Sequence, residues 1–89
     1  TAASATWGRI WGPANPTNGD KTQYYASVEP AGANFKFAVT GGTHADTKIS
    51  DAGELQCGAE NEAHPLTIEL YNADKSKLLD SAQVYTKND

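Results

Sequence analysis

The stretch PLTIELYNADKSKLLDSAQVY, residues 65–85, carries the clearest fold signal in the chain. Over residues 65–71, apolar side chains occupy every second position, and these are Leu66, Ile68 and Leu70. Such alternation is typical of a β-strand with one buried face. Turn-forming residues occupy positions 72–77, and a second alternating segment follows at 78–85. The stretch therefore predicts an antiparallel β-hairpin.

The returning segment of this hairpin contains one residue that disturbs the pattern. Its inner face is predicted to hold Leu78, Ala82 and Val84. Asp80 falls on that same face, where burial of a carboxylate is costly. We therefore expect a β-bulge near Leu78-Leu79 that turns Asp80 outward.

The rest of the chain alternates in the same way and is punctuated by Gly and Pro at short intervals. Strands are expected at residues 5–11, 22–29 and 33–40, with shorter ones near 48–50 and 55–57. The inner faces are predicted to hold Tyr24, Ala26 and Val28 in the second of these strands, and Phe35, Phe37 and Val39 in the third.

Turn residues mark where these strands end. Asn18-Gly19 predicts a tight turn, because both residues tolerate positive φ. Pro30 ends the strand before it, because proline has no N–H to donate to a ladder. No apolar stripe with helical spacing is long enough to predict a helix. The fold class is therefore all-β: residues 1–89 are expected to form a single small antiparallel β-sandwich with about six or seven short strands.

The composition limits the classes of function that this domain can have. The 89 residues carry 7 basic and 11 acidic side chains, and the formal net charge is −4. Nucleic-acid binding is not expected, because the basic residues are scattered along the chain and outnumbered. Membrane insertion is not expected either, because no apolar run approaches the roughly 18–20 residues of a spanning helix. Leu, Ile, Val and Phe number only 13, which predicts a modest core.

The amino-terminal residues bear on localisation. The chain begins Thr1-Ala2-Ala3-Ser4, without Met. Signal peptidase leaves small residues of this kind at a mature amino terminus, although trimming of a longer chain leaves the same start. We expect a secreted or cell-surface protein.

Catalytic and metal sites are not expected. His44, Cys57 and His64 suggest blue-copper ligands in a β-sandwich, but the spacing is too long for the usual ligand loop and the chain has no Met. A tetrahedral zinc site would need Asp46 or Glu62, and no paired spacing supports it. Cys57 is expected to be buried and unreactive, because acidic rather than basic residues lie near it. The prediction is a non-enzymatic protein with no metal and no cofactor.

Aromatic residues give the strongest indication of a binding site. Trp7 and Trp11 share one face of the first strand; Trp7 is expected in the core, and the position of Trp11 is open. Two adjacent Tyr residues in the next strand must point to opposite faces, so one of them is expected to be exposed. Exposed rings stack on sugar rings, with Asn and Asp side chains in nearby loops as hydrogen-bond partners. The candidate binding residues are Trp11, Tyr24, Tyr25, Asn15 and Asp20.

The segment Ala3-Ser4-Ala5-Thr6-Trp7 is a short lead of small residues into a Trp-bearing first strand. It resembles the amino-terminal region of some bacterial fimbrial (pilin) subunits of the chaperone–usher type, and the Thr- and Ala-rich strands and Gly/Pro/Asn loops are similar to that family. The resemblance implies an immunoglobulin-like subunit that lacks one strand, accepts it from a neighbour, and so forms a polymer.

Three functions remain open. The first expectation is a secreted surface-structure subunit of a fimbrium or an adhesive domain, which contacts a protein partner or another copy of itself through an edge strand or a face. The alternative is a small carbohydrate-binding module whose exposed aromatics bind a glycan. A further alternative is a secreted inhibitor or effector protein.

Overall fold

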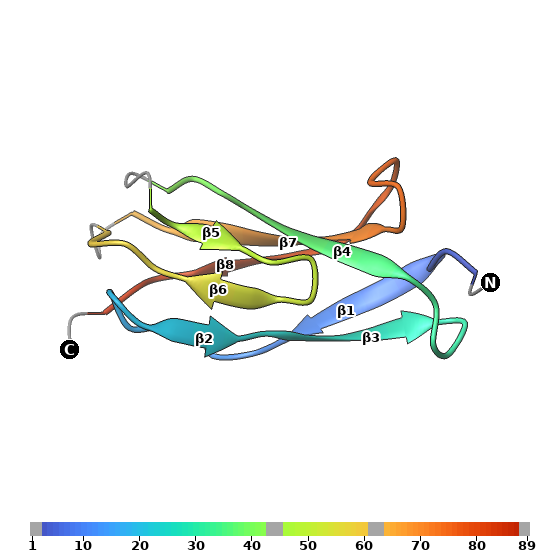
Figure 1. Cartoon of the computed structure of the whole chain (residues 1–89), viewed down its shortest axis with the longest axis horizontal. Coiled ribbons are helices and arrows are strands. Elements are labelled where there is room, and N and C mark those ends of the chain that lie inside the picture. Colours follow the sequence, from blue (N-terminus) through green and yellow to red (C-terminus); the bar gives the residue numbers. More distant parts are fainter. Residues whose placement is uncertain (1–2, 43–45, 61–63, 88–89) are drawn as a thin grey trace.

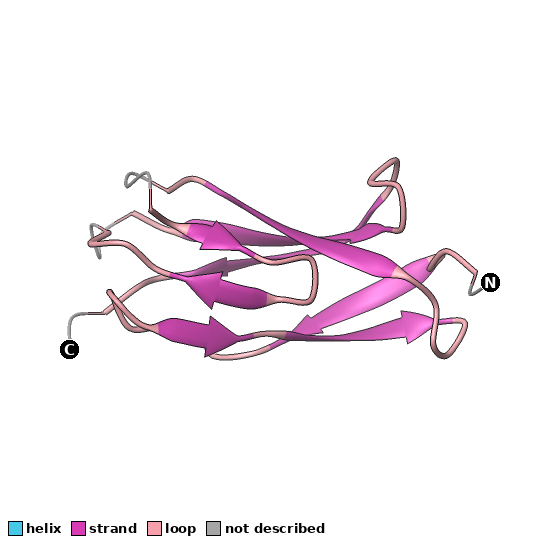
Figure 2. Cartoon of the chain, viewed as in Figure 1, coloured by secondary structure: helices cyan, strands magenta, loops and turns pink. Residues whose placement is uncertain are grey.

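The computed structural model describes residues 3–42, 46–60 and 64–87, and all regular structure in these ranges is β-strand (Figure 1; Figure 2). The strands are β1 Trp7–Trp11, β2 Lys21–Gln23, β3 Tyr25–Glu29, β4 Phe35–Thr40, β5 Lys48–Ile49, β6 Glu54–Gln56, β7 Leu66–Asn72 and β8 Leu78–Val84. Only Tyr24 separates β2 from β3, so these two strands share one strand position. Within the described ranges, no helix is long and apolar enough to cross a membrane.

The strands are ordered as in a constant-type immunoglobulin sandwich. β1 pairs with β3, β2 pairs with β6, and β6 pairs with β5, all antiparallel. Because β2 leads straight into β3 (Figure 1), these pairs make up one layer. The second layer consists of β4, β7 and β8, with β7 in the middle. These are the four-strand and three-strand sheets of that sandwich, so the predicted fold class is confirmed.

The core lies between the layers, and the predicted inner faces of residues 22–29 and 33–40 contribute to it. Every apolar side chain expected to face inward in residues 22–29 and 33–40 is buried or packs against the buried cluster. Each buried aliphatic or aromatic side chain of this kind stabilises the fold by roughly 1.5–3 kcal/mol. The buried cluster comprises Tyr24, Phe37, Leu55, Cys57, Leu66, Ile68, Leu70 and Val84.

The β7–β8 hairpin contains the predicted bulge, at Leu79. Leu70 pairs with Asp80, and Tyr71 pairs with Leu78, so Leu79 is the extra residue of β8. Leu79 packs against the core, whereas Leu78 is exposed. The prediction that Leu78 points inward was therefore wrong, because the bulge moves the inward position by one residue.

Asp80 stays on the inner side of the sheet, opposite Leu70, and the expectation that the bulge turns it outward was wrong. Its carboxylate Oδ2 accepts a hydrogen bond from the backbone N–H of Ile10 at 2.8 Å. Ile10 belongs to β1 in the other layer, so this bond joins the two sheets at their edge. The carboxylate tolerates its half-buried position because a backbone donor replaces water there.

The amino-terminal segment contacts both layers. After β1 pairs with β3, the chain bends at Gly12-Pro13 and continues beside the end of β8. There the N–H of Tyr85 donates to the carbonyl of Ala14 at 3.0 Å, and the N–H of Lys87 donates to the carbonyl of Pro16 at 2.9 Å. Directly after these bonds, Thr17 and Lys87 form a parallel β-bridge. This segment therefore occupies backbone groups of the chain just after β8.

Candidate functional site

Both Trp side chains and Tyr25 lie together on the outward face of β1 and β3. Trp7 is 52% exposed, Trp11 is 51% exposed and Tyr25 is 63% exposed. Polar side chains of the same two strands lie between and beside them. Three cross-strand pairs make up this surface, which we call the aromatic face: Trp7–Glu29, Arg9–Ser27 and Trp11–Tyr25.

The opposite side of β1 explains why Trp7 and Trp11 point outward. Gly8 is buried there, and an added Cβ would lie only 2.6 Å from Cδ2 of Leu70. Ile10, on the same side as Gly8, packs against the core. The close approach of β1 to the second layer leaves no room for an indole on the inner side. The expectation that Trp7 belongs to the core was therefore wrong.

Two contacts hold the Trp11 indole in place on the aromatic face. Its Nε1–H donates to Oγ of Ser27 on β3 at 2.9 Å. The guanidinium carbon of Arg9 lies over the ring, 4.8 Å from its centroid, which is a cation–π arrangement. These contacts restrict the side chain to one orientation before any ligand binds, so less conformational entropy is lost on binding.

Tyr24 is not part of this surface, although the sequence made it a candidate. Its side chain is 1% exposed, and its hydroxyl donates to the carbonyl of Pro13 at 2.7 Å. Burial raises the pKa of the Tyr24 phenol to about 12, and the nearby Cys57 adds to the shift. The prediction that one of the two adjacent Tyr residues is exposed is confirmed, and the exposed one is Tyr25.

The two polar candidates from the loops lie elsewhere. The side-chain N–H of Asn15 donates to the carbonyl of Tyr85 at 2.9 Å, so this residue anchors the amino-terminal segment to the chain after β8. Asp20 precedes β2 and is five positions from Tyr25, or about 16 Å along an extended strand. Neither side chain is therefore placed beside the aromatic face.

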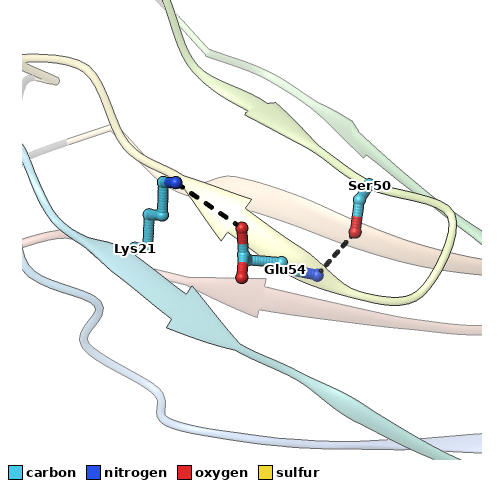
Figure 3. A network of polar contacts seen from close by, with 3 residues as sticks. All are labelled: Lys21, Ser50 and Glu54. Atoms are coloured by element: carbon cyan, nitrogen blue, oxygen red, sulfur yellow. Dashed lines mark hydrogen bonds and ion pairs between the residues drawn. The ribbon is translucent and has the colours of Figure 1, made fainter.

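The outward side chains include an aromatic residue on β3 but only polar residues on β2, although the two strands are continuous. On the β2–β6 half, every outward side chain is polar. Lys21 Nζ lies 3.9 Å from Glu54 Oε1, and Ser50 Oγ accepts the backbone N–H of Glu54 at 3.0 Å (Figure 3). An exposed pair of this kind contributes at most about 1 kcal/mol to stability. The aromatic side chains are thus confined to the β1–β3 half.

The second notable feature is a hollow of about 450 Å³ that borders Cys57, Asp46 and Gln56. Cys57 itself is 2% exposed, as predicted. Burial raises the pKa of its thiol, and Glu60 and Asp20 raise it further, so the reactive thiolate is disfavoured. The hollow therefore offers no activated nucleophile.

The residues considered for a metal site can be placed only in part. His44 and Glu62 lie outside the described residues. Among the described ones, no group of three or more His, Cys, Asp or Glu side chains is close enough to hold a metal ion.

The sequence reasoning did not select four residues of the aromatic face, which are Trp7, Arg9, Ser27 and Glu29. Alternation in β1 already placed Arg9 on the same side as both Trp residues. Ser27 becomes visible only once the pairing of β1 with β3 is known. No protein-family model matches the sequence, and no curated protein or solved structure matches it either.

Proposed function

We propose that this chain is a non-enzymatic adhesive domain, secreted or displayed at a cell surface, that binds carbohydrate through the aromatic face. The observation that carries the proposal is the grouping of Trp7, Trp11 and Tyr25 on one outward surface, each about half exposed or more. Large aromatic side chains grouped on a surface mark interaction sites more often than isolated exposed residues do.

The cost of this exposure supports a binding role. An aromatic side chain can bury roughly 150–250 Å² on folding, and this chain has few aliphatic residues to fill its core. Yet both Trp residues lie outside the core. Because these side chains are exposed, the free energy of their burial does not stabilise the fold. A ligand that covers them gains that free energy on binding.

The shape of the surface favours a sugar over a deeply enclosed small molecule. The aromatic face is the outer side of two paired strands, and the hollow described above is lined by other residues. Flat aromatic surfaces suit the apolar C–H faces of sugar rings, while the phenol of Tyr25 and the polar side chains beside it can form hydrogen bonds. One face of the Trp11 ring is covered by Arg9, so stacking there uses the other face.

Face contact is also better supported than strand addition. The N–H of Phe37 in β4 donates to the carbonyl of Asp51 at 3.2 Å, and the chain just after β8 donates to the carbonyls of Ala14 and Pro16. These bonds occupy backbone groups that an added strand would need.

Intrinsic fluorescence tests the proposal directly, because both Trp residues of the chain lie on the aromatic face. A glycan panel is screened for binders, and the strongest is titrated while Trp emission is recorded. We expect a saturable change in emission, and we expect Trp11→Ala and Tyr25→Ala each to weaken binding about tenfold.

Tyr85→Ala is the matched control for Tyr25→Ala. Tyr85 is also exposed, at 44%, but it follows β8 and lies outside the aromatic face. This variant should bind the glycan as the unchanged chain does. The proposal is wrong if no glycan of the panel binds, or if Tyr85→Ala weakens binding as much as Tyr25→Ala.

A further inference from the structure

We infer that the aromatic face selects sugars that carry a carboxylate, which Arg9 binds while the neighbouring rings stack on the sugar. This inference rests on the proposed function and narrows its ligand to acidic carbohydrates. It depends on the position and contacts of a single side chain.

Arg9 occupies the middle of the aromatic face. On β1 it lies between Trp7 and Trp11, two residues from each and on the same side of the strand. It is the only arginine of the chain and is exposed. A ligand that covers both Trp rings must therefore also cover the Arg9 side chain.

The Arg9 guanidinium has no acidic partner among the described side chains. The only ion pair within the described residues joins Lys21 to Glu54, on the β2–β6 half. Glu29 is the one carboxylate of the aromatic face, and it pairs across the strands with Trp7 rather than with Arg9. The guanidinium contacts the Trp11 ring instead, at 4.8 Å from the centroid.

Stacking on an indole leaves the N–H groups of a guanidinium free at its edge. Those donors match the two oxygens of a carboxylate, and the stacked position holds them ready for a bidentate contact. Most sugars are neutral, and among the anionic groups that some sugars carry, a carboxylate offers two coplanar oxygens that match the planar donor pair of the guanidinium. The net charge of −4 opposes anion binding in general, so the contact must be local.

Matched ligands separate this inference from the proposed function. The panel consists of oligogalacturonides, oligoglucuronides and sialylated oligosaccharides, each paired with its carboxyl-reduced counterpart and joined by sulfated oligosaccharides. We expect at least one carboxylated glycan to bind about tenfold more tightly than its reduced counterpart, with the preference shrinking as salt is added.

Matched variants assign the preference to Arg9. Arg9→Gln should remove the preference, so that the carboxylated glycan and its reduced counterpart bind the variant equally. Lys48→Gln changes the net charge equally, from an exposed position on β5, and should leave the preference unchanged. Arg9→Lys keeps the charge but loses the planar donor pair, so an intermediate preference is expected.

The outcomes distinguish the two proposals. Equal binding of carboxylated and reduced glycans, with loss of both in Trp11→Ala, keeps the proposed function and overturns the role of Arg9. Equal loss of both glycans in Arg9→Gln also overturns it, because Arg9 would then only position Trp11. Preference for sulfated over carboxylated glycans overturns the carboxylate assignment. Failure of every glycan to bind overturns the proposed function itself.

Discussion

At the scale of single residues, Tyr24 links three parts of the structure. Its ring belongs to the buried cluster, between β2 and β3. Its hydroxyl donates to the carbonyl of Pro13, just after the bend of the amino-terminal segment. Gly12 precedes that proline, and an added Cβ there would lie 2.2 Å from the Tyr24 ring. The buried phenol of Tyr24 and the lack of a side chain at Gly12 therefore fix the point where the segment leaves β1.

The raised pKa of Tyr24 predicts a loss of stability at high pH. The phenol titrates at about 12 in the folded chain, against an ordinary value of 10.0. Between these two values the unfolded chain loses the proton and the folded chain keeps it, so the free energy of unfolding falls as pH rises from about 10 to 12. Urea unfolding at several pH values measures this slope.

Tyr24→Phe separates the phenol from other groups that titrate in the same range. The variant should lose part of the slope above pH 10, and it should be about 1 kcal/mol less stable at neutral pH because the bond to Pro13 is gone. Tyr25→Phe removes an exposed hydroxyl and should change stability by less than about 0.5 kcal/mol. An unchanged slope in Tyr24→Phe would contradict the assignment.

At the scale of strands, β1 and β8 show how two strands can be joined by side-chain hydrogen bonds instead of a backbone ladder. The two strands belong to different sheets, yet the Asp80 carboxylate of β8 receives the Ile10 N–H of β1. Near the start of β1, Lys77 Nζ donates to the carbonyl of Thr6 at 3.4 Å. The sandwich edge is thus closed by side chains where no ladder forms.

Removing the Asp80 carboxylate should open this edge. In Asp80→Ala the half-buried N–H of Ile10 loses its acceptor, which costs about 1–2 kcal/mol. Hydrogen exchange should show faster exchange of the Ile10 amide. Asp74→Ala removes a carboxylate from the turn between β7 and β8 and should leave that amide protected. Equal protection of the Ile10 amide in both variants would count against the bond.

Strand positions were predictable because alternation is a local signal. Which side of a strand faces inward sometimes depends on residues far away in the sequence. Leu66, Ile68 and Leu70 identify the inward side of their strand, because the other side is more polar. In β1 one side held Trp7 and Trp11 and the other held Gly8 and Ile10, so hydrophobicity favoured the wrong side. The close approach of β1 to Leu70 decides the matter, and that approach depends on the whole fold.

The candidate site was predictable to the extent that it depends on strands. Trp11 and Tyr25 were both selected, and strand pairing places them opposite each other. Asn15 and Asp20 were selected because they lie in loops near these residues in sequence. Their positions in space depend on where the chain bends and on the length of β2, which short-range patterns do not specify.

At the scale of the whole molecule, the described strands complete both sheets from a single chain. β8 occupies the last strand position beside β7, and residues 14–17 pair with the chain just after β8. The seven strand positions of a constant-type sandwich are thus filled by described residues of this chain. The resemblance to fimbrial subunits stays a prediction, and its polymer is the alternative that solution mass can test.

Light scattering on a sizing column provides that test. For a carbohydrate-binding adhesive domain we expect a single mass near 9.4 kDa over a tenfold concentration range, with and without reductant. Oligomers that persist in reductant would favour a self-assembling subunit, and loss of those oligomers in Trp11→Ala would place the contact on the aromatic face. Dimers that reductant abolishes would contradict the buried position of Cys57.

The amino-terminal segment also determines how the domain would bear mechanical load. The molecule is elongated, 40 × 19 × 18 Å, and the two ends of the chain lie at opposite ends of its long axis (Figure 1). Tension applied through those ends would pull residues 14–17 and 85–87 past each other, because these two segments run parallel. The bonds at Ala14 and Pro16 would then be loaded in shear and share the force, instead of opening one after another. Under the proposed adhesive function, this arrangement would resist extension along the long axis.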